Sequence, residues 1–359
     1  MKAEKQFKMK CSLLTNHVCI HTTGEYRLCC ASQEESKIHN VKNLSPINWL
    51  ASDYIQNIKN TFEQDIWPIS CVGCQRREDN GLASKRLLSN ELYSGDGIKY
   101  IDVRLGNTCN LRCQMCWPVS SSKIAKDMEV LTKQFGTSPW TSMIPLSFVP
   151  NSNWQDSIEI LDKLIVNGLE EIYITGGEPF LNKHLVKLLS KIPKSVKIRF
   201  NTNGTIFNKQ IANELDKFSY VQIDVSIDAY GQKNDYIRAD STWKDIDTNI
   251  DLFKEFAVVN ATPTVSVYNV LYLKELYDFC HSKDIKCHPD ELIGPTKFCI
   301  SNAPDAMKAE IKGFENLINV PSLVEEQQDF IRYVKQTDSI RNIDIRQSLP
   351  EVAKFYGID

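Results

Sequence analysis

Three cysteines within eight residues constrain this chain more than any other feature. Residues 109–116 place Cys109, Cys113 and Cys116 in a C-x3-C-x2-C spacing. Cysteine thiolates hold iron–sulfur clusters, and three thiolates on a four-iron cluster leave one iron without a protein ligand. A structural zinc site would normally close with a fourth Cys or His nearby, but the next histidine is His184. The spacing therefore favours a [4Fe-4S] cluster with one open iron over a zinc site or a set of core thiols.

This stretch resembles the cysteine motif of the radical S-adenosylmethionine (SAM) superfamily. The resemblance implies that Cys109, Cys113 and Cys116 hold a catalytic [4Fe-4S] cluster whose open iron is chelated by SAM. One electron then cleaves SAM and yields a 5'-deoxyadenosyl radical. The family usually has an aromatic residue just before the third cysteine. Here Met115 stands there, and its thioether can still pack on an adenine face.

Strand and helix patterns alternate from residue 98 onward. Strand-like segments cover residues 98–105, 171–175, 196–200, 220–227, 262–267 and 285–300, and helical patterns cover 156–167, 185–192, 209–218 and 243–256. Alternation of this kind is typical of a parallel sheet with right-handed crossovers, so we predict an α/β fold. Six strands match the partial (β/α)6 barrel of the radical SAM family. Asn269 is expected to cap the helix after the fifth strand.

Short polar motifs follow four of these strands. They are the cysteine loop, Gly176-Gly177-Glu178-Pro179, residues 201–204 (Asn-Thr-Asn-Gly) and Ser226-Ile227-Asp228. Because ligands bind beyond the carboxyl ends of parallel strands, we expect the motifs to face one cavity. Glycines there let the backbone approach a ligand closely.

The resemblance also implies a set of SAM-binding residues. These are Met115, Gly176, Gly177, Glu178, Asn203, Ser226, Asp228 and Arg238. Glu178 would lie at the SAM amino group, and Arg238 would pair with the SAM carboxylate, a bidentate contact that suits arginine. The alternatives are a helix cap for Ser226 or Asp228 and a solvated ion pair for Arg238.

A second set of cysteines lies in the first 97 residues. Cys11, Gly24 and the pair Cys29-Cys30 follow a C-x12-G-x4-C spacing, and Cys71 and Cys74 form a C-x2-C pair. Residues 17–22 are rich in strand formers and a turn follows them, so a hairpin should separate Cys11 from Cys29. Residues 47–62 have helical periodicity. Such a fold could bring four thiolates around one metal centre.

This arrangement looks like the auxiliary-cluster modules called SPASM and, in shortened form, twitch. The run from Cys74 to Arg86, C-x3-E-x2-G-x2-S-x-R, is similar to twitch proteins whose module is N-terminal. The resemblance implies a second [4Fe-4S] cluster on Cys11, Cys29, Cys71 and Cys74. Zinc is the alternative, since four cysteines with a C-x2-C knuckle suit it equally. The sequence also leaves Cys30 open in place of Cys29.

Composition excludes other classes of protein. Lys and Arg number 42 against 45 Asp and Glu, a net charge of −3, so nothing indicates binding to nucleic acid or a membrane surface. No apolar run reaches the roughly 20 residues of a membrane span, and the first residues lack the apolar core of a signal peptide. Twelve cysteines then indicate metal binding in a reducing cytoplasm.

We therefore expect an auxiliary-cluster module over residues 1–97, a radical SAM partial barrel over 98–300 and a helical extension without chemistry over 301–359. The predicted function is reductive SAM cleavage and hydrogen abstraction from a peptide or small molecule. The resemblance implies a low-potential electron donor of the flavodoxin or ferredoxin type. The alternative is a non-catalytic metal-binding or electron-transfer protein with a zinc N-terminal module.

The sequence leaves the substrate, the proton acceptor and three cysteines without an assigned role. The sequence identifies neither the substrate nor the group that would accept a substrate proton. Cys280, Cys287 and Cys299 show no tight pairing, and we interpret them as core or surface thiols, with a further auxiliary cluster as the alternative.

Overall fold

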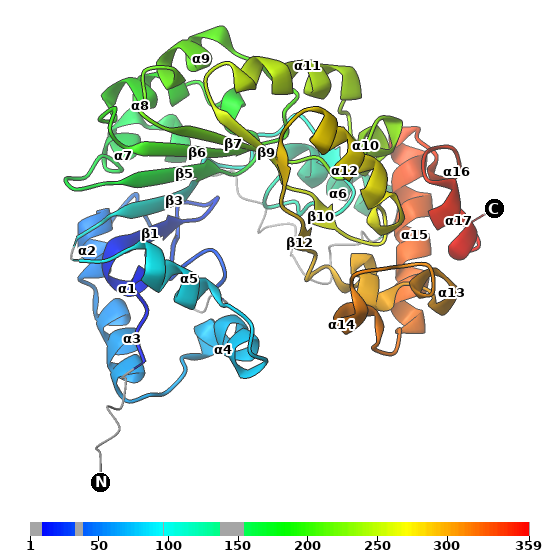
Figure 1. Cartoon of the computed structure of the whole chain (residues 1–359), viewed down its shortest axis with the longest axis horizontal. Coiled ribbons are helices and arrows are strands. Elements are labelled where there is room, and N and C mark those ends of the chain that lie inside the picture. The colour runs from blue at the N-terminus through cyan, green and yellow to red at the C-terminus, as the bar shows by residue number, and fades with distance from the viewer. Residues whose placement is uncertain (1–8, 33–38, 96, 137–153, 359) are drawn as a thin grey trace. The chain divides into compact units, whose positions relative to one another are not determined.

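The computed structural model describes residues 9–32, 39–95, 97–136 and 154–358 (Figure 1). Two compact units divide the chain. Unit 1 takes in Met1–Gly106, Asn151–Arg199 and Lys217–Tyr220, and unit 2 takes in Asn107–Pro150, Phe200–Asp216 and Val221–Asp359. Each unit combines helices with parallel strands, so the predicted α/β class is confirmed.

The sheet of unit 1 is mostly parallel. Its hydrogen-bonded order is the first half of β6 (Lys197–Thr202), then β5 (Glu171–Thr175), β3 (Tyr100–Arg104), β1 (His17–Ile20) and β2 (Tyr26–Arg27). Strands β1 and β2 pair antiparallel with Ile20 opposite Tyr26, which confirms the predicted hairpin. Strand β3 is parallel to both β1 and β5, so Asp102 lies opposite Cys19 and Tyr173. Strands from both sides of the expected boundary at residues 97 and 98 therefore belong to the same sheet, and the division into an N-terminal module and a barrel stays a prediction.

Helices surround this sheet. They are α1 (Leu13–Asn16), α2 (Pro46–Leu50), α3 (Asp53–Glu63), α4 (Val72–Asp79), α5 (Lys85–Leu92), α7 (Ile158–Asp162) and α8 (Leu185–Lys191). Figure 1 shows α7 and α8 on one side of β5 and the helices α3, α4 and α5 on the other. The single helix predicted over 47–62 is wrong in one respect, because the chain breaks into α2 and α3. Ser52 starts α3 by accepting the Ile55 amide, a typical N-cap contact.

Unit 2 holds the remaining strands. The order is β11 (Lys286–Cys287), β9 (Val258–Ala261), β7 (Val221–Val225) and the second half of β6, with two small pairs, β4 (Arg112–Cys113) with β8 (Arg238–Ala239) and β10 (Thr264–Val265) with β12 (Asp290–Glu291). The fifth strand was expected at 262–267, but β9 ends at Ala261. Pro263 explains the difference, because proline cannot donate a hydrogen bond to a ladder. Asn269 does not cap a helix either; its amide donates to the carbonyls of Asp228 and Thr264.

The helices of unit 2 include the C-terminal part of the chain. They are α6 (Ser122–Phe135), α9 (Lys209–Leu215), α10 (Gln232–Ile237), α11 (Trp243–Lys254), α12 (Leu273–Ser282), α13 (Asp305–Lys308), α14 (Glu315–Ile318), α15 (Val324–Arg341), α16 (Ile345–Ser348) and α17 (Pro350–Phe355). The last residues are helical, as predicted. They are not a separate layer, since Phe330, Tyr333 and Leu349 pack in the same buried cluster as Met115 and Ile124.

None of the helices in the described part of the chain is long and apolar enough to cross a membrane.

Candidate functional site

The cysteine loop of unit 2 is held by hydrogen bonds to neighbouring segments on two sides. Strand β4 pairs with β8 so that Cys113 lies opposite Arg238, and the Gln114 amide donates to the Ile237 carbonyl at 2.7 Å. On the other side, the Cys109 amide donates to the hydroxyl of Ser122 at 3.2 Å, at the start of α6. Hydrogen bonds to α6 and β8 therefore position the loop.

Gln114 ties this loop to the C-terminal helix α15. Its side chain is fully buried and accepts a hydrogen bond from Arg341 at 2.9 Å, while its carbonyl accepts one from the Tyr333 hydroxyl at 2.7 Å. Arg341 also pairs with Asp127 of α6 at 2.7 Å. Buried hydrogen bonds of this kind rigidify the region around them. The sequence analysis missed these residues, because 219 positions separate Gln114 from Tyr333 and no local pattern connects them.

Arg238 places a positive charge beside Cys113. Its Nη1 atom lies 3.9 Å from the Cys113 sulfur, and its Nε atom lies 2.8 Å from the carboxylate of Asp228. Asp228 is fully buried and also accepts the Thr264 amide at 2.8 Å. Burial raises the pKa of the Cys113 thiol, and Arg238 opposes that rise because a cation favours the thiolate. Arg238 is thus part of a buried ion pair next to the loop and not of a solvated one.

Two other predicted residues lie at the ends of neighbouring strands. Asn203 donates to the side chain of Asn110, inside the cysteine loop, at 2.9 Å. Asn110 in turn donates to Thr205 at 2.8 Å. The Ser226 hydroxyl donates to Asn201 at 2.5 Å. Of these two predicted residues, Asn203 is therefore joined to the loop directly.

The Gly176-Gly177-Glu178 motif ends β5 in unit 1, as predicted. Gly176 has φ +87°, and a Cβ there would lie 2.7 Å from the Cβ of Arg104, so close packing on β3 requires glycine. Glu178 is buried and accepts the Phe180 amide at 3.0 Å. SAM contacts by these residues, and an adenine contact by the buried Met115 of unit 2, stay predictions.

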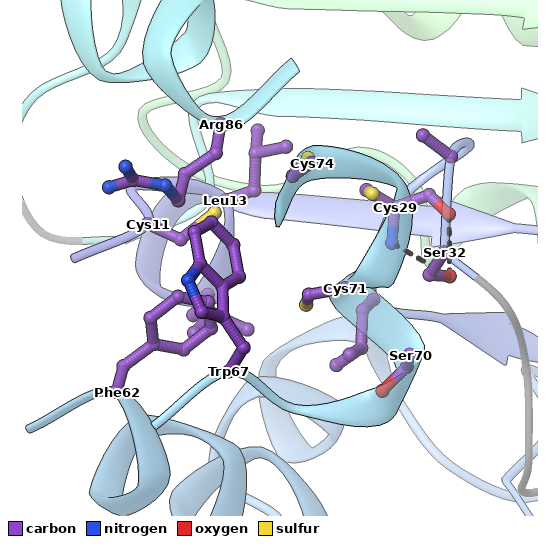
Figure 2. Close-up of a pocket in the computed structure, with 13 residues that line it drawn as sticks. Cys11, Leu13, Cys29, Ser32, Phe62, Trp67, Ser70, Cys71, Cys74 and Arg86 are labelled. Carbon is purple, nitrogen blue, oxygen red and sulfur yellow. Dashed lines mark hydrogen bonds between the residues drawn. The ribbon is translucent and has the colours of Figure 1, made fainter. Parts of the chain in front are cut away.

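Four cysteines of unit 1 line one pocket, and Figure 2 shows them around a common space. Cys11 precedes α1, Cys29 follows β2, and Cys71 and Cys74 lie at η1 (Ile69–Cys71) and in α4. Cys29, and not the exposed Cys30, belongs to the pocket lining. The structure therefore brings together the four thiols named from the sequence spacing.

The buried surroundings of this pocket disfavour the ionised form of its thiols. Burial raises the pKa of Cys11 to about 11 and that of Cys71 to about 12, and the neighbouring thiols add to both shifts. A metal-bearing group supplies the positive charge that thiolates need in such a place. Four soft ligands among Leu13, Phe62 and Trp67 fit an iron–sulfur cluster. In the described residues no three His, Cys, Asp or Glu side chains are close enough to hold one single metal ion.

The polar residues of the Cys74–Arg86 run contact one another at the pocket wall. Arg86 forms a two-pronged ion pair with Glu78, its Nε atom donating at 3.0 Å. The Ser84 hydroxyl donates to the same carboxylate at 2.5 Å. The Arg86 guanidinium also lies over the Trp67 ring, 5.3 Å from its centre. The spacing of this run is thus explained by one network of side chains.

The three remaining cysteines of unit 2 do not gather around one centre. Cys280 of α12 and Cys287 of β11 form a thiol pair, whose hydrogen bond lowers the pKa of Cys287. Cys299 is buried and donates to the Leu292 carbonyl at 3.0 Å. Their surroundings suit the interpretation as core and surface thiols.

Comparison with known proteins gives matches over the centre of the chain. The family model described as the radical SAM superfamily matches residues 103–280. GTP 3',8-cyclase of Synechocystis sp. is 28% identical over 141 residues, which are 39% of this chain and 36% of the relative. GTP 3',8-cyclase of Helicobacter pylori is 32% identical over 135 residues, 37% of this chain and 35% of the relative. The matched part is thus about a third of the length of these curated relatives.

Solved structures resemble the chain more loosely. Streptococcus suis SuiB bound to precursor peptide SuiA has a TM-score of 0.38 and 14% identity, covering 89% of this chain and 59% of SuiB. Native anSMEcpe with bound AdoMet has a TM-score of 0.37 and 14% identity, covering 68% and 62%. These likenesses are too low to transfer a site. The family match spans the cysteine loop and the strand-end motifs through Arg238, and residues 103–280 of this chain therefore form a radical SAM superfamily domain.

Proposed function

We propose that this protein is a radical SAM enzyme that cleaves SAM reductively at a [4Fe-4S] cluster on Cys109, Cys113 and Cys116. The observation that carries the proposal is the cysteine loop itself. Within a radical SAM domain, it is held by buried hydrogen bonds through Gln114 and faces the Arg238 guanidinium. Bound there, the cluster and SAM would supply a 5'-deoxyadenosyl radical for hydrogen abstraction.

The chain's own residues would bind and orient the cofactors. The three thiolates hold the cluster, and Arg238 offsets part of their charge. Asp228 lies 2.8 Å from the Nε atom of Arg238, and the other guanidinium donors would bind the SAM carboxylate, as the family resemblance implies. Asn203, anchored on the loop residue Asn110, is assigned to a SAM hydroxyl or carboxylate. Glu178 is assigned to the SAM amino group, as the family resemblance implies.

We further propose that unit 1 carries an auxiliary [4Fe-4S] cluster on Cys11, Cys29, Cys71 and Cys74. The support is that these four thiols line one pocket in which burial disfavours free thiolates. Four protein ligands leave no open iron, so this cluster would transfer electrons or support the fold without binding SAM. An electron left on a substrate radical could pass to it, which suits a two-electron oxidation.

The proposed substrate is a peptide or a small molecule. A peptide is the first candidate, because the auxiliary-cluster modules that the N-terminal cysteines resemble often belong to peptide-modifying enzymes. GTP is the second candidate, because the curated relatives are named GTP 3',8-cyclase. A flavodoxin or ferredoxin is the proposed electron donor, and the cytoplasm is the proposed location since both clusters need a reducing environment.

The central test is anaerobic reduction of the iron-loaded protein with SAM and measurement of 5'-deoxyadenosine by chromatography. The wild-type protein should form it, and a variant with Cys109, Cys113 and Cys116 all changed to Ala should not. If the wild-type protein with both clusters loaded forms none, the alternative of a non-catalytic electron-transfer protein is correct. Adding GTP or candidate peptides, with mass spectrometry of each, then separates the two substrate classes.

A further inference from the structure

Arg86 is the charged residue of the four-cysteine pocket. Among the described residues that line the pocket, it alone carries a permanent charge, and its side chain is only 12% exposed. Figure 2 shows Arg86 on the side of the pocket where Cys11 lies. Arg86 therefore places a positive charge in the wall of the pocket that the four cysteines line.

The guanidinium is held from three directions. Glu78 binds it through two nitrogens, the Lys10 carbonyl accepts from its Nη1 atom at 2.7 Å, and the Trp67 ring covers one face. Lys10 is the neighbour of Cys11, so this contact ties the guanidinium to a ligand segment. Burial acts to raise the pKa of Glu78, but the hydrogen bonds from Arg86 and Ser84 outweigh it and hold that pKa below its ordinary value. The carboxylate thus stays ionised and the arginine stays in place.

We propose that Arg86 sets the reduction potential of the auxiliary cluster, and that Glu78 positions Arg86 and offsets part of its charge. The inference rests on the proposed [4Fe-4S] assignment of this pocket. A four-thiolate cluster gains one negative charge when one electron reduces it. A fixed cation stabilises the reduced form more than the oxidised form, and net charge beside a cluster is among the factors that set its potential. Arg86 therefore makes the auxiliary cluster a better electron acceptor.

The sign of the effect separates this role from a purely structural one. Arg86→Gln removes a positive charge and should shift the midpoint potential to more negative values. Glu78→Gln removes a negative charge at the same network and should shift it to more positive values. Damage to the pocket would not produce opposite shifts from two neighbouring substitutions. Arg86→Lys keeps the charge and should restore most of the wild-type potential, although lysine cannot form the two-pronged contact.

The experiment is a redox titration followed by electron paramagnetic resonance on the iron-loaded full chain. The background carries Ala at positions 109, 113 and 116, so that only the auxiliary cluster contributes a signal. Each variant is compared by iron content and midpoint potential. Arg76→Gln is the matched control, since Arg76 lies on the same helix α4 as Glu78 but is exposed and does not line the pocket. Solvent screens exposed charges, so the control should shift the potential less than Arg86→Gln.

The outcomes distinguish failure of the cluster assignment from failure of the proposed role of Arg86. Zinc in place of about four irons in the background protein overturns the cluster assignment and with it this inference. About four irons with an unchanged potential in Arg86→Gln overturns the inference and leaves the assignment standing. If the Arg86→Gln variant does not bind iron, the midpoint potential of Glu78→Gln tests the inference instead. A shift of that potential to more positive values supports the role of the charge pair, and an unchanged potential contradicts it.

Discussion

Both cysteine sites of this chain have an arginine–carboxylate ion pair close to their cysteines. In unit 2 a buried Arg238–Asp228 pair lies beside three thiols, and in unit 1 a mostly buried Arg86–Glu78 pair lies beside four. Each arginine counters the cost of gathering thiolates away from water. On the proposed assignment, three thiolates would leave one iron open, so Arg238 could also bind SAM. Four thiolates would leave no iron open, so Arg86 would act on the auxiliary cluster alone.

The supports of the two sites differ as well. The cysteine loop is short in sequence but is fixed by residues far along the chain, above all Tyr333 and Arg341 of α15. The four-cysteine pocket draws its ligands from three segments, yet its charged network lies within one run, from Glu78 to Arg86. The compact motif is thus supported by a distant helix, whereas the ion pair beside the dispersed cysteines is formed within one run, with the Lys10 carbonyl as an additional distant contact. The following predictions test this contrast, in order of expected effect.

The largest effect is expected from changing Cys109, Cys113 and Cys116 together to Ala. The variant should lose about four irons and form no 5'-deoxyadenosine, because no site remains where SAM can meet an open iron. Iron analysis and product chromatography measure both. Retained iron in the unit 1 pocket would show that the two sites load independently. Retained SAM cleavage would refute the catalytic assignment.

Removal of the four-cysteine site of unit 1 should abolish product formation, a step that follows SAM cleavage. Cys71→Ala/Cys74→Ala should lose about four irons and should keep reductive SAM cleavage, but it should lose product formation from the true substrate. Single substitutions test whether Cys29 or Cys30 is the ligand. Cys29→Ala should lose auxiliary iron, whereas its neighbour Cys30→Ala should keep it, because only Cys29 lines the pocket. Equal iron in the two single variants would contradict the ligand set.

An intermediate effect is expected at Arg238. Arg238→Gln should weaken SAM binding by about 2 kcal/mol, the range of hydrogen bonds to charged groups, or roughly 30-fold in the dissociation constant. Equilibrium binding of SAM to the iron-loaded protein measures it. Arg112→Gln is the control: Arg112 lies in the same loop but pairs with Asp240 at 2.7 Å, so its loss should change SAM binding far less. Similar losses in both variants would point to general damage of the loop.

The smallest effect concerns the support from α15. Tyr333→Phe removes the hydrogen bond to the Gln114 carbonyl and should lower the free energy of unfolding by about 1 kcal/mol, with faster loss of iron from the loop. Tyr356→Phe is the matched control, because the Tyr356 hydroxyl has no hydrogen-bond partner among the described residues. Thermal unfolding of the two variants gives the difference. Equal stability would mean that the α15 contact does not support the loop.

Local sequence patterns predicted much of the fold and of the two cysteine sites. The C-x3-C-x2-C spacing identified the loop, and alternation of strand and helix predicted the α/β class with β5 at residues 171–175. The spacing of Cys11, Cys29, Cys71 and Cys74 also predicted members of one pocket, and the structure places Cys29 in its lining, where the sequence had left Cys30 open as the alternative. Such features are recoverable because side-chain periodicity and ligand spacing are properties of neighbouring residues.

Tertiary structure decided what depends on contacts between distant segments. It moved the fifth strand ahead of Pro263, turned Asn269 from a helix cap to a partner of Asp228, and drew the C-terminal helices into the core around Met115. It also joined Gln114 to Tyr333 across 219 positions. The sequence by itself determined the family motif, and with it the predicted chemistry, since motif and spacing are local. The packing alone determined which side chains hold that chemistry in place, because burial and hydrogen-bond partners exist only once distant segments meet.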